Sequence, residues 1–553
     1  MSPTHPRRVP YWTLFAFAAL LALPLSWGLA AMAVAGAGVV AVSALRRAAA
    51  QRAAARPPSE GEVVLGVDGR GRPVALSDRQ LAAHGLIVGA SGAGKSTTLL
   101  GILTDQIRRG KSVVAIDLKG SPAFAAQLRR SAELAGREFR LWTPDGPEHW
   151  NPLAHGNATS LKDKLIATER FTEPHYQRAA ERYVQAAVGV LLTARPGQAP
   201  QLEDVVSLME PRRLASMLRH VDRPLADRVQ DYLAGLTPDQ VSAVRGLGTR
   251  LAILSESHAG PYLAPSRDPS RSTIDLRRTL EGEDVVLFSL NSSVYGKLAG
   301  QLGTLVIQDL VSNAGHRLGT SGDGQRAPAQ VVIGIDEFSA LGADNVVALL
   351  ARGREAGAAV LLCTQELADL DRAGPGFRDQ VLGNTSLKLA HRQDVPSSAH
   401  TIAQMIGTEL VWQETRQLQN PFGRSPAGRG TRRQVEQFIV HPNEIKALQT
   451  GEVVMLTKMP VARATRLRVL PPAPAGGRGP SAGGPAGGRG PSAPGQTGGA
   501  EPRGQAGGAE QRGQADGAPR RGQAGGAEQR GQGGAGRRGR AGGADQPDPG
   551  VTR

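Results

Sequence analysis

The segment from Gly89 to Ser96, which reads GASGAGKS, constrains the fold of this chain more than any other. It fits G-x-x-x-x-G-K-[ST] at every fixed position. An apolar run at 86–88 precedes it, and a helix-compatible run at 97–107 follows it. A strand, a glycine-rich turn and a helix in this order predict the phosphate-binding loop of an α/β fold.

The residue types in this loop predict the chemistry of its ligand. Glycines let the backbone curl so that successive N–H groups point at phosphates, and the helix that follows adds its positive end. Lys95 would reach the β- and γ-phosphates, and the Ser96 hydroxyl would complete a Mg²⁺ shell. We therefore expect ATP and Mg²⁺ as ligands. The residues expected to contact them are Gly89, Gly92, Ala93, Gly94, Lys95, Ser96 and Thr97.

The alternative is a chance glycine-rich turn, because the chain has 70 glycines. Most of them lie elsewhere, and a chance match would not also separate a strand pattern from a helix pattern. The formal net charge of +16 suits a polyanionic partner such as DNA or an anionic membrane surface, but an arginine-rich coding bias would give the same sign. A single cysteine, Cys363, excludes an intramolecular disulfide framework and a zinc site built from cysteines.

The N-terminal part of the chain has the composition of a membrane anchor. No charged residue occurs between Val9 and Leu45, and pairs of arginines flank this stretch at 7–8 and 46–47. One helix of this length would run about 55 Å, against a hydrocarbon core of about 30 Å. Two short spans with a break near Pro24 fit better, and both arginine pairs then face the cytoplasm. One long tilted helix and a cleaved signal peptide are the alternatives.

The patterns that follow predict a nucleotide-binding core interrupted by a helical insertion. Apolar runs predict a β-hairpin at 62–76 and strands at 112–117, 140–142 and 283–290, with a helix at 298–312. Apolar residues recur at helical spacing between about 160 and 254. The predicted divisions are a membrane anchor and linker at 1–58, the first part of the core at 59–159, a helical domain at 160–255, the second part of the core at 256–470 and a tail at 471–553.

A second strong signal is the segment 330–338, QVVIGIDEF, an apolar strand ended by Asp336 and Glu337. Asp336 would hold Mg²⁺ through water, and Glu337 would orient and deprotonate the attacking water. The strand predicted at 112–117 is also followed by polar residues at its carboxyl end, Asp117 and Lys119. These two would face the same crevice, or they would form an ordinary turn after a strand.

Further strands are expected at 359–362, 387–391, 453–457 and 464–470. Gln365 follows the first of them and would sense the γ-phosphate. Arg392 follows the second, and a surface salt bridge is the simplest role for it, as it is for Arg352 and Arg354. The family resemblance given below implies that one of these three arginines, with Arg392 as the first candidate, would act as an arginine finger towards a neighbouring subunit.

The tail from 471 onwards has no aromatic residue and almost no aliphatic residue larger than alanine, and it repeats GGRGPSA and GGAEQRGQ. Such a composition cannot offset the entropy of ordering, so we expect disorder. It holds 11 Arg against 6 Asp and Glu, a charge of +5. This favours either electrostatic binding of nucleic acid or a solvated spacer.

These residues together resemble the type IV coupling proteins of conjugation and secretion systems, of TraG/TraD type, within the FtsK/HerA-like branch of RecA-like motor ATPases. The resemblance covers roughly residues 1–470. It depends on the paired N-terminal spans, HGLIVGASGAGKS, VVAIDLKG, the NPL segment, the helical insertion, IDEF, CTQ and GNTSLKLAHRQD. The apparent connection between the two spans is shorter than the small domain found in many relatives.

The resemblance implies a RecA-like fold, a membrane-anchored homo-hexamer in the bacterial inner membrane with a cytoplasmic ATPase domain, and ATP-driven delivery of DNA to a secretion channel. It implies a relaxase or another cargo protein and channel components as partners. Residue by residue, Lys95 and Ser96 match Walker A, Asp336 and Glu337 match Walker B, and Gln365 matches the sensor position.

Three other functions are open. An ABC-type ATPase is disfavoured by motif spacing. The segment 321–325, SGDGQ, mimics the signature of that family, but Gln325 lies only 11 positions before Asp336, too few for the helix and strand that normally separate these motifs. The 241 positions from Lys95 to Asp336 accommodate a helical insertion instead. A double-stranded DNA pump of FtsK type would share the chemistry and differ in substrate. A receptor for secreted proteins would use ATP binding for assembly.

Overall fold

A computed structural model describes residues 61–472, except 170, 172, 272, 283, 321–330 and 417–429. Its central feature is an eleven-stranded sheet in the order β2-β1-β13-β12-β9-β3-β8-β7-β4-β6-β5. The strands of this sheet are β1 (Glu62–Asp68), β2 (Pro73–Ser77), β3 (Gly85–Val88), β4 (Val113–Asp117), β5 (Phe139–Trp142), β6 (Val285–Ser289), β7 (Val331–Asp336), β8 (Ala358–Thr364), β9 (Leu387–Ala390), β12 (Glu452–Thr457) and β13 (Arg463–Val469).

Seven neighbouring strands, from β9 to β5, run parallel, and β12, β13, β1 and β2 extend the sheet in antiparallel fashion. The parallel strands β3, β4, β7, β8 and β9 are buried along their whole length. This is why their sequences are continuous apolar runs rather than alternating patterns. The predicted hairpin and all of the predicted strands are present, within a few residues of their expected ends.

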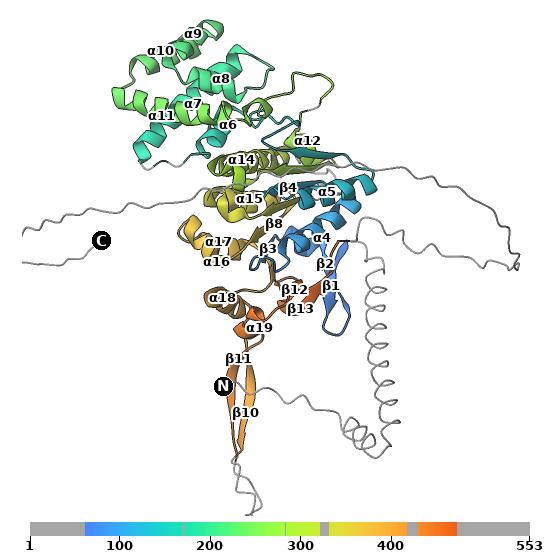
Figure 1. The fold of residues 1–553 in the computed structure, drawn as a ribbon. Helices are drawn as coiled ribbons and strands as arrows, with labels where there is room; N and C mark the ends of the chain where they lie inside the picture. Colours follow the sequence, from blue (N-terminus) through green and yellow to red (C-terminus); the bar gives the residue numbers. More distant parts are fainter. Residues whose placement is uncertain are drawn as a thin grey trace, which may run out of the picture. The chain divides into compact units, whose positions relative to one another are not determined.

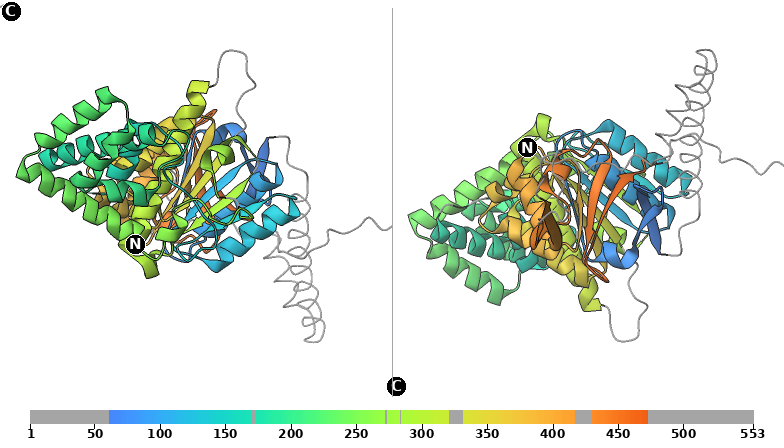
Figure 2. Two further views of the ribbon diagram at one scale, coloured as in Figure 1. Left: turned by 90° about the horizontal axis from the view of Figure 1, so that it is seen from above. Right: turned by 90° about the horizontal axis from the view of Figure 1, so that it is seen from below.

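Helices cover both faces of the sheet, and successive side chains of one strand point to opposite faces. In β4, Val114 and Ile116 join one apolar core, and Val113 and Ala115 join the other. Figure 2 shows the helices on opposite sides of the strands. On the second face lie α4 (Lys95–Arg108) and α5 (Pro122–Leu134), and on the first lie α14 (Lys297–Thr320), α15 (Ala343–Glu355), α16 (Leu367–Ala373), α17 (Phe377–Asn384) and α18 (Pro396–Ile406).

Of the helices described between β5 and β6, six lie together at one end of Figure 1. They are α6 (Ala158–Ile166), α7 (Pro174–Ala194), α8 (Leu202–Leu208), α9 (Pro211–Met217), α10 (Arg223–Ala234) and α11 (Pro238–Ser255). Capping signals begin several of them: Asn157 caps α6, and Thr237 forms a capping box with Gln240 in α11. Their apolar faces pack around Tyr183 and Val188 of α7, which are fully buried.

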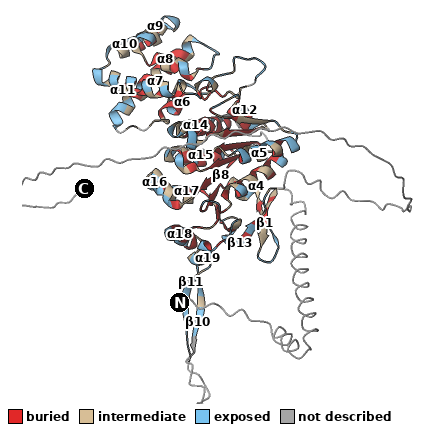
Figure 3. Ribbon diagram, in the orientation of Figure 1, coloured by how far each residue is buried: buried red, intermediate tan, exposed pale blue. Residues whose placement is uncertain are grey.

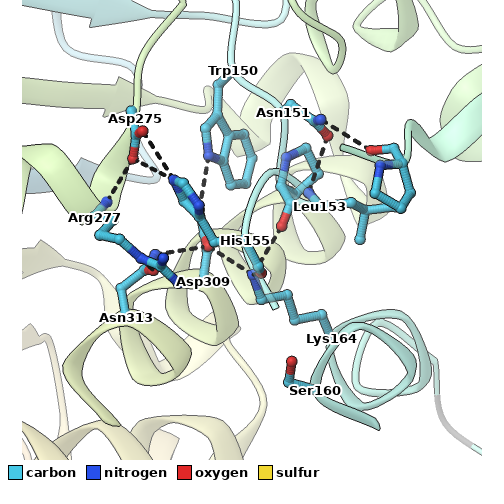
Figure 4. Close-up of polar contacts among 12 residues, drawn as sticks. Trp150, Asn151, Leu153, His155, Ser160, Lys164, Asp275, Arg277, Asp309 and Asn313 are labelled. Atoms are coloured by element: carbon cyan, nitrogen blue, oxygen red, sulfur yellow. Dashed lines mark hydrogen bonds and ion pairs between the residues drawn. The ribbon is translucent and has the colours of Figure 1, made fainter. Parts of the chain in front are cut away.

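A buried polar cluster joins this helical segment to α14, one of the helices that cover the sheet (Figure 4). Lys164 of α6 donates from Nζ to Oδ1 of Asp309 on α14 over 2.8 Å, and the two side chains are 1% and 3% exposed. Lys164 also donates to the carbonyl oxygens of Pro152 and His155. Asp309 accepts further hydrogen bonds from Trp150 Nε1 (3.1 Å) and Asn313 Nδ2 (3.0 Å). Each charge in the cluster is therefore paired and hydrogen-bonded, as a buried charge requires.

A separate two-stranded ribbon, β10 (Thr408–Arg416) with β11 (Gly430–Phe438), follows α18 and was not predicted from the sequence. It extends away from the sheet and is mostly exposed (Figures 1 and 3). Leu410 and Trp412 are among its exposed apolar side chains, and the guanidinium of Arg432 lies 4.6 Å from the Trp412 ring centroid. Short helices complete the fold: α3 (Asp78–Ala82), α12 (Leu276–Glu281), α13 (Ser292–Tyr295) and α19 (Pro442–Lys446), with 3-10 turns at η1 (Leu218–His220), η2 (Gly260–Tyr262) and η3 (Phe338–Ala340).

Within the described ranges, no helix has the length and apolar character needed to cross a membrane. The two spans predicted between Val9 and Leu45 lie outside the described residues, as does the predicted disordered tail at 471–553 apart from its first two residues.

Candidate nucleotide site

The phosphate loop connects β3 to α4 in the structure, as predicted. Gly92 and Gly94 have φ values of 73° and 113°, a left-handed conformation that L-residues with a side chain rarely adopt. Lys95 and Ser96 then form the first turn of α4. Of the remaining predicted ligand residues, Ala93 is buried in the loop and Thr97 is exposed on the helix. The loop therefore has the backbone shape of an anion-binding nest at a helix N-terminus.

The ammonium of Lys95 lies inside this loop. It donates to the carbonyl oxygens of Gly89, at 2.5 Å, and Ala90, at 3.1 Å. Burial lowers the pKa of Lys95, the nearby Lys119 lowers it further, and the carboxylates of Glu337 and Asp336 oppose the shift. A phosphate in the loop would give this ammonium an anionic partner in place of two neutral carbonyls.

Strand register brings the second predicted motif to the same place. Asp336, the last residue of β7, is aligned with Asp117 of β4, and β8 and β3 end beside them. The Ser96 hydroxyl donates to Oδ2 of Asp336 over 2.9 Å, although the two residues are 240 positions apart. The Walker A hydroxyl and the Walker B carboxylate are thus in direct contact.

Glu337 has an unusual backbone, with φ 62° and ψ 49°. For a residue with a side chain this left-handed conformation costs free energy, of order 1–3 kcal/mol, and it is concentrated at functional sites. Gln365, just after β8, donates from Nε2 to Oε2 of Glu337 over 3.1 Å, and the Ser339 hydroxyl lies 3.4 Å from Oε1. The predicted base and the predicted sensor are therefore hydrogen-bonded to each other.

A lysine two residues after the end of β4 completes the cluster. Lys119 Nζ lies 3.2 Å from both carboxylate oxygens of Asp336 and 3.5 Å from Oε2 of Glu337. Burial alone would lower the pKa of Lys119, but the two carboxylates outweigh it and raise the pKa. Asp117 forms the turn instead, because its carboxylate accepts hydrogen bonds from the backbone N–H groups of Lys119 and Ser121. Both roles considered for the 117–119 segment are thus present, on different residues.

His391, at the end of β9, packs beneath the phosphate loop and was not assigned a role from the sequence. It is fully buried, and its Nε2 lies 2.9 Å from the Thr98 hydroxyl. A Cβ atom at Gly89 would lie only 2.5 Å from the His391 Cβ, so the first glycine of the motif is required by this packing. Burial, and then the charge of Lys95, lower the pKa of His391 to about 4, so the imidazole is neutral at pH 7.

The three candidate arginine fingers do not join the carboxylate cluster within one chain. The backbone of Arg392 adjoins the loop, since its carbonyl accepts from the N–H of Ala90, but its side chain pairs with Asp394 over 3.0 Å. Arg352 and Arg354 lie exposed in the last turn of α15. An arginine finger acts on a neighbouring subunit, so the positions of these three arginines in one chain do not identify which of them has this role.

The donor set fits a nucleotide with Mg²⁺. Mg²⁺ prefers oxygen ligands and keeps several waters, so one hydroxyl, one carboxylate and phosphate oxygens are sufficient. Ser96 and Asp336 supply the first two at adjacent positions. Among the residues that the structure describes, no group of three or more His, Cys, Asp or Glu side chains forms a metal cage. The Cys363 thiol on β8 is buried, which raises its pKa and makes it an inert core residue.

The fold and the site together define a P-loop NTPase of RecA-like class, with a mixed sheet and a helical insertion. The sequence model of the FtsK/SpoIIIE family matches residues 44–107, and the model described as the TraM recognition site of TraD and TraG matches residues 330–450. These two segments are therefore similar to FtsK/SpoIIIE proteins and to the TraG/TraD coupling proteins, and the resemblance stated from the sequence is confirmed.

Solved structures agree on the fold. The unbound conjugative coupling protein TrwB, lacking its first 70 residues, is similar with a TM-score of 0.56 and 15% identity over 75% of this chain and 90% of that chain. TrwB in complex with ADP and Mg²⁺ gives a TM-score of 0.53 at 15% identity, over 75% of this chain and 92% of that one. No curated protein sequence matches the chain significantly.

Proposed function

We propose that this protein is a membrane-anchored, ATP-driven motor that couples DNA or nucleoprotein to a type IV secretion or conjugation channel. The observation that carries the proposal is the joining of Ser96 to Asp336 and of Glu337 to Gln365 at the ends of β3, β7 and β8. These contacts support the proposal because they join the phosphate loop, the candidate metal-binding carboxylate and the candidate base, in a fold similar to that of a coupling protein.

Each residue of the cluster has a distinct task in ATP hydrolysis. Lys95 would bind the β- and γ-phosphates at the loop formed by Gly92 and Gly94. Ser96 and Asp336 would hold Mg²⁺, which supplies charge neutralisation to the phosphates when bound. Glu337 would orient the attacking water and accept its proton, and the hydrogen bond from Gln365 fixes the direction of its carboxylate.

The remaining parts of the motor come from its assembly. A homo-hexamer would place an arginine of one subunit beside the γ-phosphate bound to the next, and Arg392, Arg352 and Arg354 are the candidates. The net charge of +16 favours a DNA backbone as the substrate. The match at 330–450 favours an adaptor of TraM type as a partner, beside a relaxase or other cargo protein and channel components in the inner membrane.

The test is ATP hydrolysis by the full-length protein and by Glu337→Gln. The variant should lose at least about 100-fold in kcat while it retains nucleotide binding, because a positioned base typically contributes 10²–10⁴-fold. Glu355→Gln, in the exposed last turn of α15, is the matched control and should hydrolyse ATP like the wild type. Unchanged turnover and unchanged substrate transfer in Glu337→Gln would contradict the motor proposal.

DNA dependence separates the cargo alternatives. The match of residues 44–107 to the FtsK/SpoIIIE family favours a double-stranded DNA translocase as the second candidate. Stimulation of turnover by double-stranded DNA alone would support it, and stimulation by single-stranded DNA would support the conjugative role. No stimulation by either would indicate a receptor for secreted proteins.

A further inference from the structure

Lys119 occupies a place in the nucleotide site that neither the Walker motifs nor the sensor explains. Its ammonium bridges both Walker B carboxylates, at 3.2 Å from Asp336 and 3.5 Å from Glu337. Among the residues that the structure describes, Lys119 is the cation that pairs with each of these two carboxylates. The other lysine of the site, Lys95, is turned towards the carbonyl oxygens of its own loop. The two lysines therefore have different tasks.

The backbone around Lys119 is fixed from both sides. On the sheet side, Asp117 accepts hydrogen bonds from the N–H groups of Lys119, at 2.9 Å, and Ser121, at 2.6 Å. On the helix side, the Ser121 hydroxyl caps α5. Between them, Gly120 is left-handed at φ 67° and packs so closely on Asn291 that a Cβ atom would lie 2.5 Å from the Asn291 Cβ. Lys119 thus extends from a rigid turn, which makes its side-chain position reproducible.

The charge of Lys119 affects the binding of a cation at this site. Asp336 and Glu337 carry two negative charges, and the ammonium of Lys119 neutralises one of them. A divalent cation at Ser96 and Asp336 would share the Asp336 carboxylate with the ammonium, and like charges at such distances repel. The same bridge ties Asp336 to Glu337, so it also constrains the direction of the candidate base.

We propose that Lys119 is a positioning residue that holds the two Walker B carboxylates in register and weakens the binding of a divalent cation in the absence of nucleotide. The inference builds on the proposed function, because it concerns the same site. It predicts that the cation enters together with the phosphates, whose charge compensates for the repulsion.

The experiment measures Mn²⁺ binding to the full-length protein without nucleotide, by electron paramagnetic resonance, and melting temperature with and without Mg²⁺. Lys119→Met should bind Mn²⁺ at least about tenfold more tightly than the wild type. This is only a modest fraction of the repulsion that one unscreened charge would exert at this distance, because Lys119 is part-exposed and water screens its charge. Mg²⁺ should raise its melting temperature more than that of the wild type. Lys119→Arg should restore the wild-type affinity.

Two controls keep the outcome specific. Lys446→Met, at an exposed lysine of α19, should leave Mn²⁺ affinity unchanged. Adding Asp336→Asn to Lys119→Met should abolish the gain in affinity, because the gain acts through that carboxylate. Equal Mn²⁺ affinity in Lys119→Met and wild type would overturn the inference. These measurements need no ATP turnover, so they decide on Lys119 even if the protein hydrolyses no ATP.

A kinetic arm tests the positioning role. With saturating Mg²⁺, Lys119→Met should lower kcat and leave the affinity for nucleotide within about twofold, since the phosphates contact the loop and not Lys119. An unchanged kcat would remove the positioning part of the inference.

Discussion

At the scale of single residues, the nucleotide site depends on groups that never touch a ligand. His391 is the clearest case: it lies under the phosphate loop, where Gly89 packs on its Cβ and Thr98 bonds its Nε2. A charged imidazole at this position would be desolvated and close to the ammonium of Lys95. The loop is therefore supported by a histidine that must remain neutral.

This requirement predicts a pH dependence of stability. The pKa of His391 is about 4 in the folded protein and about 6.5 in the unfolded chain, so between these values the unfolded state binds more protons. The contribution is complete above pH 6.5 and declines as the pH falls towards 4. At pH 5.5 the loss from this one group is about 1.4 kcal/mol.

Urea unfolding of the wild type and His391→Gln at pH 7.5 and pH 5.5 measures it. Glutamine can still bond Thr98 but does not titrate. The difference in unfolding free energy between the two proteins should shrink by about 1.3 kcal/mol at the lower pH. An identical difference at both pH values would show that His391 is not the titrating group.

At the scale of elements, the buried pair Lys164–Asp309 is the main polar link between α6 and α14 (Figure 4). Removing one partner leaves the other charge buried, which typically costs about 3–5 kcal/mol. Lys164→Met should therefore lower the unfolding free energy by about 3 kcal/mol, measured by urea unfolding. Fluorescence is a suitable signal because Trp150 bonds Asp309 directly.

Its neighbours supply the comparison. Lys162→Met, on the same helix but paired with the half-exposed Asp163, should cost less than about 1 kcal/mol. The double variant Lys164→Met with Asp309→Asn should regain part of the loss, because no uncompensated charge remains. If Lys162→Met and Lys164→Met are equally destabilising, the buried pair has no special role.

Elements with a continuous local signal were predictable, and those without one were not. The buried strand 331–336 is apolar throughout and ends in two acids, so its position and end were clear. The ribbon β10–β11 was missed because Glu409, Gln413 and Glu414 interrupt its apolar residues and because both faces are exposed. A strand pattern signals burial on one face, and this ribbon has little burial to signal.

The site shows the same division. Ser96 and Asp336 were both predicted to serve a metal site because each belongs to a motif with known chemistry, and the structure brings the two side chains into contact. The bridge from Lys119 to Glu337 depends on the pairing of β4 with β7, and the left-handed backbone of Glu337 depends on tertiary packing. Neither has a signature in a local stretch of sequence.

At the scale of the whole molecule, the last strand of the sheet, β13, ends before the basic tail begins. β13 pairs with both β12 and β1, and the N–H of Leu470 donates to the carbonyl of Leu65 over 3.0 Å. The described part of the chain ends two residues later, at 472. The residues described above for the nucleotide site and for both apolar cores all lie before this end.

Truncation after Pro472 should consequently leave the melting temperature and basal ATP turnover unchanged, the latter within about twofold. The truncation removes 11 Arg and 6 acidic residues, and the rest of the chain keeps a charge of +11, since 16 minus 5 is 11. DNA binding should therefore persist, with a smaller slope of log affinity against log salt if the tail contacts phosphates. Basal turnover lost on truncation would show that the tail belongs to the motor. An unchanged salt slope would identify it as a spacer, which assigns recognition of DNA to the folded body.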